Sequence, residues 1–296
     1  MSIKFGIIGY SHGNGHPFSW SIACNGYKKK YLDLIPYKNI RNYLPKYDLN
    51  YHKIKNAEVT HIWTHNLKVS KLIGKVCNIK NISKSLKELT ESVDAILFLR
   101  DDLISRKKYL KEVLRSGKPV YLDKFIALKE LEVKKYLRYQ KYDGQIFSES
   151  PFCNSKKLIL NKKELKEIGK IKAIYAISNG SWESYSSHVV QPVLKFIKVK
   201  KILKYNLIKS NQVNNLNIKW SNKIITNFIT LGKSFGGIYI NIIGEKSEKK
   251  ISWDFDAVFG DFIVTIKKFI YMIENKKKLI LKKEYLLLSK VLEKGL

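Results

Sequence analysis

The sequence of 296 residues is poor in cysteine, in arginine and in long apolar runs. Its three cysteines, Cys24, Cys77 and Cys153, are odd in number and far apart, so they predict no zinc site and no disulfide framework, and we expect buried, reduced thiols. No apolar run reaches about 18 residues, so no transmembrane helix is predicted. The amino terminus lacks the long apolar segment and cleavage site of a secretory signal, and we expect a cytoplasmic protein with no membrane partner.

Arginine supplies only five of the 56 basic residues, although the formal net charge is +31. Such a charge attracts anionic partners, including nucleic acid. Proteins that read a base sequence favour arginine, because its guanidinium forms paired hydrogen bonds with base edges. Here the cations are mostly lysines spread along the chain beside many isoleucines and asparagines, which resembles the codon bias of an AT-rich genome. We therefore expect solvated lysine faces and no specific nucleic-acid partner, with weak anion binding as the alternative.

The composition is that of a globular chain, since 45% of the residues are hydrophobic and 12% are aromatic. The length allows two domains. In residues 1–150, strand and helix patterns alternate, which predicts a Rossmann domain: a doubly wound parallel sheet that binds a dinucleotide. The insertion at 27–56 is long for a bare loop, so we expect short helices or a cover over the site. The expected strands are 3–8, 59–64, 93–99, 120–122 and 145–148, and the expected helices are 17–26, 69–77, 85–91, 103–116 and 128–142.

Beyond residue 150 the pattern changes to consecutive strands joined by short polar turns. This change predicts a second α/β domain, residues 151–296, with a mainly antiparallel open sheet. We expect this domain to bind substrate and to form a homo-oligomer through its sheet. The expected strands are 171–177, 202–208, 216–220, 224–231 and 237–243, and the expected helices are 156–168, 185–197, 262–274 and 285–294.

A glycine-rich turn joins the first expected strand to the first helix. In a dinucleotide site the first glycine turns the chain sharply, and small residues after it let backbone amides approach the pyrophosphate. Gly9 fits the first position, whereas Ser11 and Asn14 stand where the second and third glycines belong. A glycine turn without a ligand is the alternative. The predicted cofactor contacts in this turn are Gly9, Tyr10, Ser11 and His12.

Two histidines, His12 and His16, flank the turn. We interpret them as loop histidines near the phosphates, with a metal site as the alternative, because no carboxylate or cysteine set nearby in the sequence would complete the coordination. The second strand ends at Asn66, where an NAD site would carry an acid for the ribose hydroxyls. An uncharged acceptor favours NAD over NADP only weakly, and Lys68 leaves NADP open.

The segment Gly117–Lys124, Gly-Lys-Pro-Val-Tyr-Leu-Asp-Lys, carries a short strand that stops at a lysine beside an acid. Ligands of open α/β sheets bind at the carboxyl ends of the strands. Lys124 is therefore predicted to reach a bound substrate rather than bulk water. The predicted cofactor contacts at the ends of this strand and the preceding one are Leu99, Arg100, Asp123 and Lys124.

His188 lies on an expected helix in the second half of the chain. A lone histidine on an apolar helix is most often a core residue. Tyr185, however, precedes it by one helical turn on the same face. A histidine that titrates near neutral pH suits proton removal from an alcohol.

These segments resemble the glucose–fructose oxidoreductase and inositol dehydrogenase (Gfo/Idh/MocA) family. The resemblance is carried by 5–9, by the block 93–124 and by the helix with Tyr185 and His188. It implies a Rossmann domain followed by an α/β domain with an open antiparallel sheet, and it implies oxidation or reduction of sugars and cyclitols with NAD or NADP. Four residues depart from the family pattern. In Asp123-Lys124-Phe125, which corresponds to its Glu-Lys-Pro, Asp123 and Phe125 differ, and Ser184 and Arg106 replace an aspartate and a histidine.

The resulting hypothesis is an oxidoreductase that moves a hydride between nicotinamide C4 and a hydroxyl-bearing carbon. Its substrate would be sugar-like or nucleotide-sugar-like, in surface polysaccharide or carbohydrate metabolism. Lys124 would polarise the oxygen, His188 would relay the proton, and Tyr185 would position the substrate. Because Ser184 and Phe125 depart from the family pattern, the alternative is an inactive nucleotide-binding or regulatory protein that keeps the fold.

Overall fold

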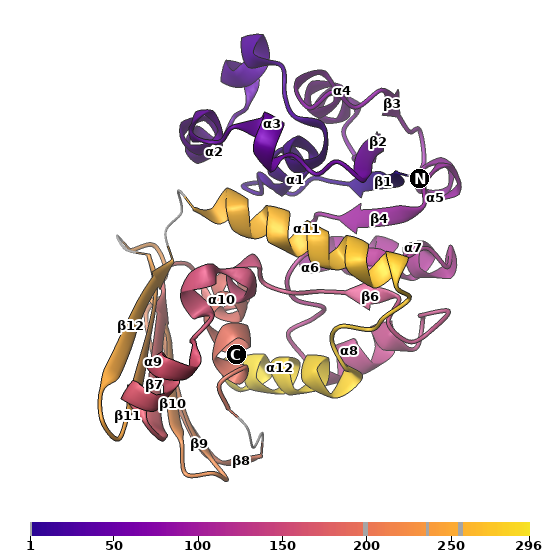
Figure 1. Ribbon diagram of the computed structural model, residues 1–296. Helices are drawn as coiled ribbons and strands as arrows, with labels where there is room; N and C mark the ends of the chain where they lie inside the picture. The colour runs from indigo at the N-terminus through magenta and orange to yellow at the C-terminus, as the bar shows by residue number, and fades with distance from the viewer. Residues whose placement is uncertain (1, 198–200, 235–236, 254–256) are drawn as a thin grey trace. The chain divides into compact units, whose positions relative to one another are not determined.

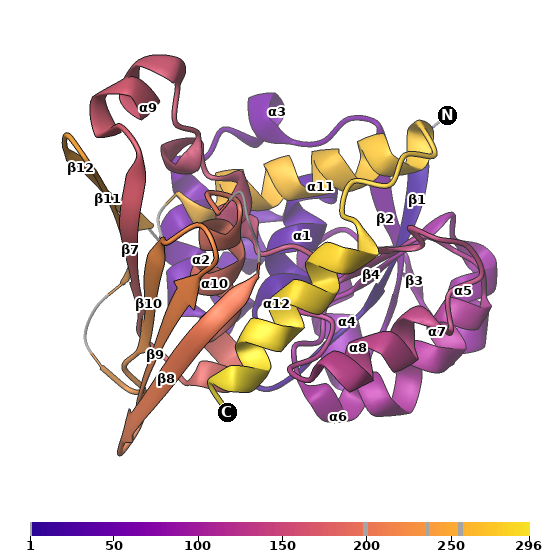
Figure 2. The same cartoon turned by 90° about the horizontal axis from the view of Figure 1, so that it is seen from below.

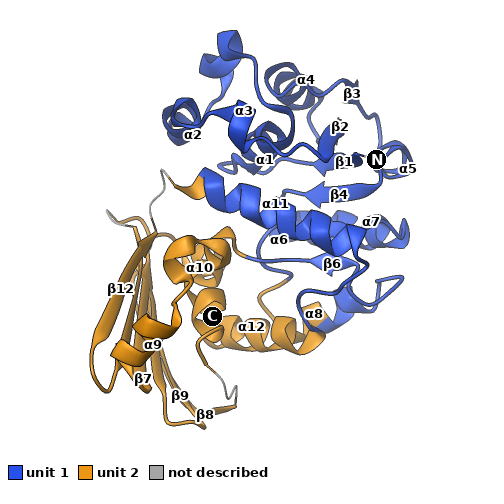
Figure 3. Ribbon diagram, in the orientation of Figure 1, with its two compact units in different colours: residues 1–126, 134–149, 259–281 blue, residues 127–133, 150–258, 282–296 orange. Residues whose placement is uncertain are grey.

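The computed structural model describes residues 2–197, 201–234, 237–253 and 257–296 (Figure 1). The chain forms two compact units (Figure 3). The chain enters unit 2 at Ser150, near the predicted boundary, whereas the segment 259–281 lies in unit 1 rather than with the second half of the sequence. Unit 1 comprises residues 1–126, 134–149 and 259–281, and unit 2 comprises residues 127–133, 150–258 and 282–296.

Unit 1 is built on a six-stranded sheet in the order β3-β2-β1-β4-β5-β6, and every adjacent pair is parallel. The strand order reverses between β1 and β4, which makes the carboxyl ends of these two strands the expected ligand site. Every residue of β4 is buried, as its continuous apolar run predicts. The predicted doubly wound parallel sheet is confirmed. Its strands are β1 (Ile3–Ile8), β2 (Ala57–Trp63), β3 (Asn81–Ile82), β4 (Ala95–Phe98), β5 (Val120–Leu122) and β6 (Ile146–Phe147).

Helices that connect successive strands cover this sheet. In the helix predicted over 103–116, one π turn, η3 (Arg106–Leu110), separates two short α-helical pieces. Helix α11 (Val258–Glu274) packs on the sheet through Phe269. The centroid of its ring lies 5.9, 6.2 and 6.1 Å from the ring centroids of Phe5, Tyr121 and Phe147. The helices are α1 (His16–Asn25), α4 (Leu67–Val76), α5 (Leu86–Ser92), α6 (Leu103–Ser105), α7 (Lys111–Arg115) and α11 (Val258–Glu274), with α8 (Glu130–Leu137) shared between the units.

The insertion at 27–56 carries short helices, as predicted. It contains η1 (Lys29–Leu34), α2 (Lys38–Tyr43), η2 (Leu44–Lys46) and α3 (Leu49–His52). Ile35, Ile40 and Leu44 are buried, so the segment is anchored by its own apolar side chains.

Unit 2 contains a second six-stranded sheet in the order β12-β11-β7-β10-β9-β8 (Figure 2). Only the β7–β10 pair is parallel, so the prediction of a mainly antiparallel sheet is confirmed. Helix α10 packs on β7, β10 and β11, and α12 packs on α10. The strands are β7 (Ile171–Ser178), β8 (Ile202–Ser210), β9 (Val213–Trp220), β10 (Ile225–Thr230), β11 (Ile238–Gly244) and β12 (Glu248–Trp253), and the helices are η4 (Pro151–Asn154), η5 (Lys156–Leu158), α9 (Lys162–Ile168), α10 (Trp182–Leu194) and α12 (Lys282–Lys294).

Two details of unit 2 differ from the sequence prediction. The helix expected over 156–168 is interrupted, because Asn161 starts α9 with a capping box that pairs it with Glu164. The edge strand β12 was not predicted, because its first three residues are charged. Within the described part of the chain, no helix has the length and apolar character needed to cross a bilayer.

Candidate active site at the carboxyl ends of the parallel strands

The turn after β1 is shaped for a close approach between strand and helix. The Gly9 N–H donates to the Trp63 carbonyl oxygen over 3.1 Å. A Cβ atom on Gly9 would lie 2.9 Å from Cγ of Pro17, so a side chain would fit only if α1 moved. Gly9 is therefore required by the fold itself, as well as being the predicted first glycine of a dinucleotide site.

Four consecutive backbone amides in this turn have no hydrogen-bond acceptor in the described part of the chain. Among the described residues, no hydrogen bond uses the N–H groups of residues 10–13. They directly precede α1, and Gly13 takes a positive φ of 80°. Unpaired amides in front of a helix N-terminus are the usual donors to a phosphate group. The turn thus fits the pyrophosphate of a dinucleotide despite its irregular glycine spacing.

The other predicted side chains of the turn lie at the same edge of the sheet. Ser11 is buried and its hydroxyl donates to the Asp101 carboxylate. The Tyr10 ring lies parallel to the His65 ring, with centroids 6.2 Å apart. His12 is exposed.

Asn14 explains why glycine is absent from the third position. Its side chain is buried, and its amide nitrogen donates to Asp123 Oδ2 over 3.2 Å and to the Leu99 carbonyl oxygen over 3.5 Å. Its amide oxygen accepts the His16 N–H over 2.8 Å. Asn14 therefore ties the turn after β1 to the ends of β4 and β5, a role that a glycine cannot perform.

Asp123 is the centre of the site. Its side chain is fully buried, and Oδ2 lies 2.7 Å from His16 Nδ1 while Oδ1 accepts the Lys124 N–H over 2.9 Å. Burial alone would raise the pKa of Asp123, but His16, Lys124 and Arg106 outweigh burial and hold that pKa below its usual range. Asp123 is therefore an organised, ionised carboxylate, although it is shorter than the glutamate of the family pattern.

Arg106 holds the backbone that follows β5. It is fully buried in the π turn, where burial lowers the pKa of the guanidinium while Asp123 opposes that effect. The guanidinium donates to the carbonyl oxygens of Asp123 (3.0 Å), Lys124 (3.3 Å), Ile126 (3.2 Å) and Phe125. In the sequence, Arg106 is visible only as a departure from the family pattern. In the structure, its guanidinium holds the backbone of residues 123–126 in place.

Lys124 is almost fully enclosed, with 7% of its surface exposed. Among the described residues, its ammonium forms no ion pair and no hydrogen bond. A buried, unpaired ammonium beside an ionised carboxylate has the donor that polarisation of a substrate oxygen needs.

The ends of β2 and β4 carry a further polar group of three side chains. Arg100 is 8% exposed and bonds to Asp102 (3.1 Å) and to His65 Nδ1 (2.8 Å). Burial and then Arg100 lower the pKa of His65. Asn66 caps α4, since its oxygen accepts the Lys68 N–H over 3.0 Å, which leaves the amide nitrogen for a ribose hydroxyl. No local pattern in the sequence marks His65 as a site residue.

In unit 2, the predicted pair Tyr185 and His188 lies on α10 with ring centroids 5.7 Å apart. His188 is 6% exposed, and its Nδ1 lies 2.8 Å from the Ser150 hydroxyl. The Trp253 ring also packs against His188, with the ring centroids 5.2 Å apart. Ser184 is exposed. The shared face of Tyr185 and His188 is thus confirmed, while their catalytic role stays a prediction.

A metal alternative for His12 and His16 finds no support in the geometry. In the part of the chain that the structure describes, no group of three or more His, Cys, Asp or Glu side chains could hold a metal ion. His16 instead pairs with Asp123.

No protein-family model and no curated protein matches the sequence, but solved structures match the fold. The chain has the inositol dehydrogenase fold. It aligns with scyllo-inositol dehydrogenase from Lactobacillus casei with bound NAD(H) and scyllo-inositol at a TM-score of 0.71 and 14% identity, over 99% of this chain and 95% of that one. It aligns with myo-inositol 2-dehydrogenase from Lactobacillus plantarum at a TM-score of 0.75 and 11% identity, over 99% of this chain and 96% of that one. It aligns with GenD2 from gentamicin A biosynthesis in complex with NAD at a TM-score of 0.72 and 9% identity, over 99% of this chain and 92% of that one.

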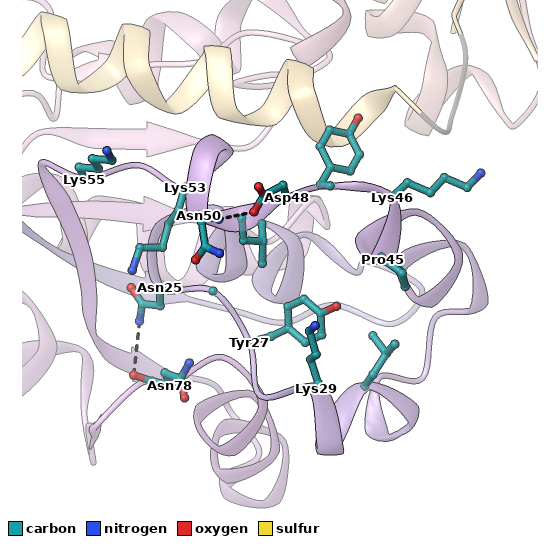
Figure 4. Close-up of a pocket in the computed structure, with 14 residues that line it drawn as sticks. Asn25, Tyr27, Lys29, Pro45, Lys46, Asp48, Asn50, Lys53, Lys55 and Asn78 are labelled. Atoms are coloured by element: carbon teal, nitrogen blue, oxygen red, sulfur yellow. Dashed lines mark hydrogen bonds between the residues drawn. The ribbon is translucent and has the colours of Figure 1, made fainter.

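A large cavity of unit 1 lies at the amino edge of the parallel sheet, opposite the candidate site (Figure 4). Helix α1 starts at the carboxyl end of β1 and runs back, so its end at Asn25 lies at the amino edge. The cavity there has a volume of about 930 Å³ and is lined by four exposed lysines, and its one acid, Asp48, accepts the Asn50 N–H over 2.9 Å as the cap of α3. The lysines are Lys29, Lys46, Lys53 and Lys55.

Proposed function

We propose that the protein is an NAD(P)-dependent oxidoreductase that moves a hydride to or from a hydroxyl-bearing carbon of a sugar-like or nucleotide-sugar-like substrate. The observation that carries this proposal is the buried Asp123–Lys124 pair at the end of β5, held by Arg106 and Asn14. The crystal structures that share the fold include enzymes with bound NAD(H), with NAD and with scyllo-inositol, which supports the same class of chemistry here.

In this proposal the dinucleotide lies along the carboxyl ends of β1, β2 and β4. The free amides of residues 10–13 bind the pyrophosphate, and Asn66 binds the ribose. NAD is favoured over NADP because the matching structures contain NAD, while Lys68 leaves NADP open. When bound, the nicotinamide accepts or returns the hydride.

The side chains of the protein then handle the oxygen and the proton. In the oxidation direction, the reacting carbon loses a hydride while its hydroxyl loses a proton, and a carbonyl group forms. Lys124 hydrogen-bonds to this oxygen and stabilises the charge that develops on it. Tyr185 positions the substrate. A histidine relays the proton, and His188 is the residue that the sequence predicts for this step.

We also propose that the protein acts as a homo-oligomer through the open face of the second sheet. Alternate residues of its central strands leave this face apolar and solvent-exposed, with Tyr175, Ile225 and Tyr239 each between 43% and 49% exposed. Ile229 pairs with Ile177 on the same face. A second copy of the sheet would bury these side chains. Such an enzyme in the cytoplasm would serve carbohydrate or surface polysaccharide metabolism.

The second candidate is a nucleotide-binding protein without turnover. The exposed Ser184 favours it, because this side chain stands where the family pattern has an aspartate and cannot act as an acid. Both candidates require nucleotide binding, and only the first requires a reaction.

Calorimetry with NAD(H) and NADP(H), followed by turnover assays with scyllo-inositol, myo-inositol and nucleotide sugars, tests the proposal. His12→Glu would place a carboxylate among the free amides, and we expect about tenfold weaker nucleotide binding, equivalent to about 1.4 kcal/mol. Asn50→Glu makes the same charge change at the amino edge and should have no effect. A folded wild type that binds no nucleotide would refute the proposal, and binding without turnover would favour the second candidate.

A further inference from the structure

His16 is a histidine of the carboxyl edge of the parallel sheet, and its ring is fixed on two sides. Its Nδ1 lies 2.7 Å from Asp123 Oδ2, and the edge of its ring meets Phe262 of α11 at 5.2 Å and 69°. About 20% of the side chain is exposed, whereas the Asp123 side chain is fully buried. Among the described residues, no hydrogen bond uses Nε2 of His16. One nitrogen is therefore anchored and the other is left for a ligand.

The chemistry of the pair fixes the tautomer. An ionised carboxylate only accepts hydrogen bonds, so Nδ1 of His16 carries the proton and Nε2 of the neutral ring offers a lone pair. The carboxylate also stabilises the imidazolium that forms when Nε2 takes up a proton. This is the arrangement of a general base that is oriented by a buried acid.

The same carboxylate fixes the backbone of Lys124. Asp123 Oδ1 accepts the backbone N–H of Lys124 over 2.9 Å while Oδ2 holds His16. One carboxylate thus fixes both the proton-accepting ring and the backbone that carries the oxygen-polarising lysine, and Asn14 also holds this carboxylate over 3.2 Å. Arg106 fixes the backbone on the far side through four carbonyl oxygens.

We infer that His16 is an acid–base residue of the proposed reaction, that it takes up through Nε2 the proton that the substrate hydroxyl releases, and that Asp123 is its positioning residue. The O–H bond breaks as the carbon loses its hydride to the nicotinamide, the C=O bond forms, and the proton passes from Nε2 to water. The role rests on the proposed function. It transfers to His16 the relay that the sequence predicts for His188.

His16→Asn is the test variant, because an asparagine amide can still donate to Asp123 but has no group in place of Nε2. We expect kcat to fall by about 10²-fold or more, with nucleotide affinity kept within a few-fold. The fall of log kcat/KM toward low pH that reports the base should disappear in His16→Asn and persist in His188→Asn. His16→Ala should regain activity when imidazole is added.

Each contrary outcome has a distinct meaning. Wild-type turnover and an unchanged pH profile in His16→Asn would overturn the assignment of His16 while leaving the oxidoreductase in place. A loss of nucleotide affinity at unchanged kcat would overturn it too and make His16 a phosphate ligand. A wild type that turns over none of the substrates would remove the proposed function and the role of His16 together.

A nitrogen-15 spectrum of the histidine rings supplies a readout that does not need turnover. We expect neutral His16 in the Nδ1–H tautomer, and we expect Asp123→Asn to change that tautomer balance. A predominant Nε2–H tautomer in the wild type would contradict the proposed geometry, whatever the activity.

Discussion

The two edges of the parallel sheet in unit 1 carry polar groups in opposite ways. At the carboxyl edge, Arg106, Asp123 and Lys124 are each no more than 7% exposed. Hydrogen bonds fix the side chains of Arg106 and Asp123, and Lys124 lies beside the Asp123 carboxylate. At the amino edge, the cavity of about 930 Å³ is lined by lysines that reach solvent. Burying a charge costs free energy unless partners compensate for it, whereas an exposed lysine costs little. Organised chemistry is therefore expected at the carboxyl edge, although a large cavity lies at the amino edge.

Helix α1 contributes to this difference through its direction. Its N-terminus points to the carboxyl edge, where a partial positive charge and free amides favour an anion. Its C-terminus points to the amino edge, where the partial negative charge favours lysines such as Lys53 without any ligand.

The largest expected effect is on the reaction itself. Lys124→Ala should lower kcat by about 10²–10⁴-fold, because the group that polarises the reacting oxygen is lost, while cofactor affinity stays within a few-fold. Steady-state kinetics and calorimetry measure the two quantities. Lys53→Ala at the amino edge is the matched control and should behave like the wild type. Equal turnover in both variants would show that Lys124 is misassigned.

The next effect is on stability. Arg106→Leu should lower the free energy of unfolding by about 3–5 kcal/mol, because four carbonyl oxygens and the Asp123 carboxylate lose a buried cationic partner. Urea unfolding followed by circular dichroism measures this change. Arg115→Leu removes an exposed arginine of α7 and should change stability by no more than about 0.5 kcal/mol. Similar losses in the two variants would remove the structural role of Arg106.

A smaller effect concerns acid stability. The pKa of Asp123 in the folded protein is held below its value of about 3.9 in the unfolded chain, so its ionised form stabilises the fold at neutral pH. This contribution is fully present above about pH 5 and is lost as the pH falls through the folded pKa. The stability difference between wild type and Asp123→Asn should therefore shrink below about pH 4 in urea titrations. A difference that is constant from pH 7 to pH 3 would contradict the pairing with His16 and Lys124.

The smallest effect is expected at the amino edge. Replacement of Lys29, Lys53 and Lys55 by alanine should leave turnover and cofactor affinity unchanged. Any binding of nucleic acid should be weak, salt-sensitive and indifferent to sequence, and it should decrease in this variant. A gel-shift series at increasing salt measures it. A tight complex with one defined sequence at physiological salt would reverse the contrast between the edges.

The sequence by itself determined the elements with strong local patterns. Strands β1 and β4 were predictable because buried parallel strands need continuous apolar runs, and Gly9 and Lys124 were predictable because they stand where such strands end. The two-residue strand β3 and the charged edge strand β12 lack such a pattern and were not predicted. The π turn inside the helix predicted over 103–116 has no local signal either.

Only the tertiary structure decided which polar groups meet. His16 and Asn14 reach Asp123 across 107 and 109 residues of sequence, and Arg106 contacts the segment after β5 from the helix that precedes that strand. These partners depend on the strand order, which places the end of β4 between the ends of β1 and β5. Periodicity along a chain records which face of an element is buried. It does not record which distant donor will satisfy a buried carboxylate, because that choice is made only when the strands assemble side by side.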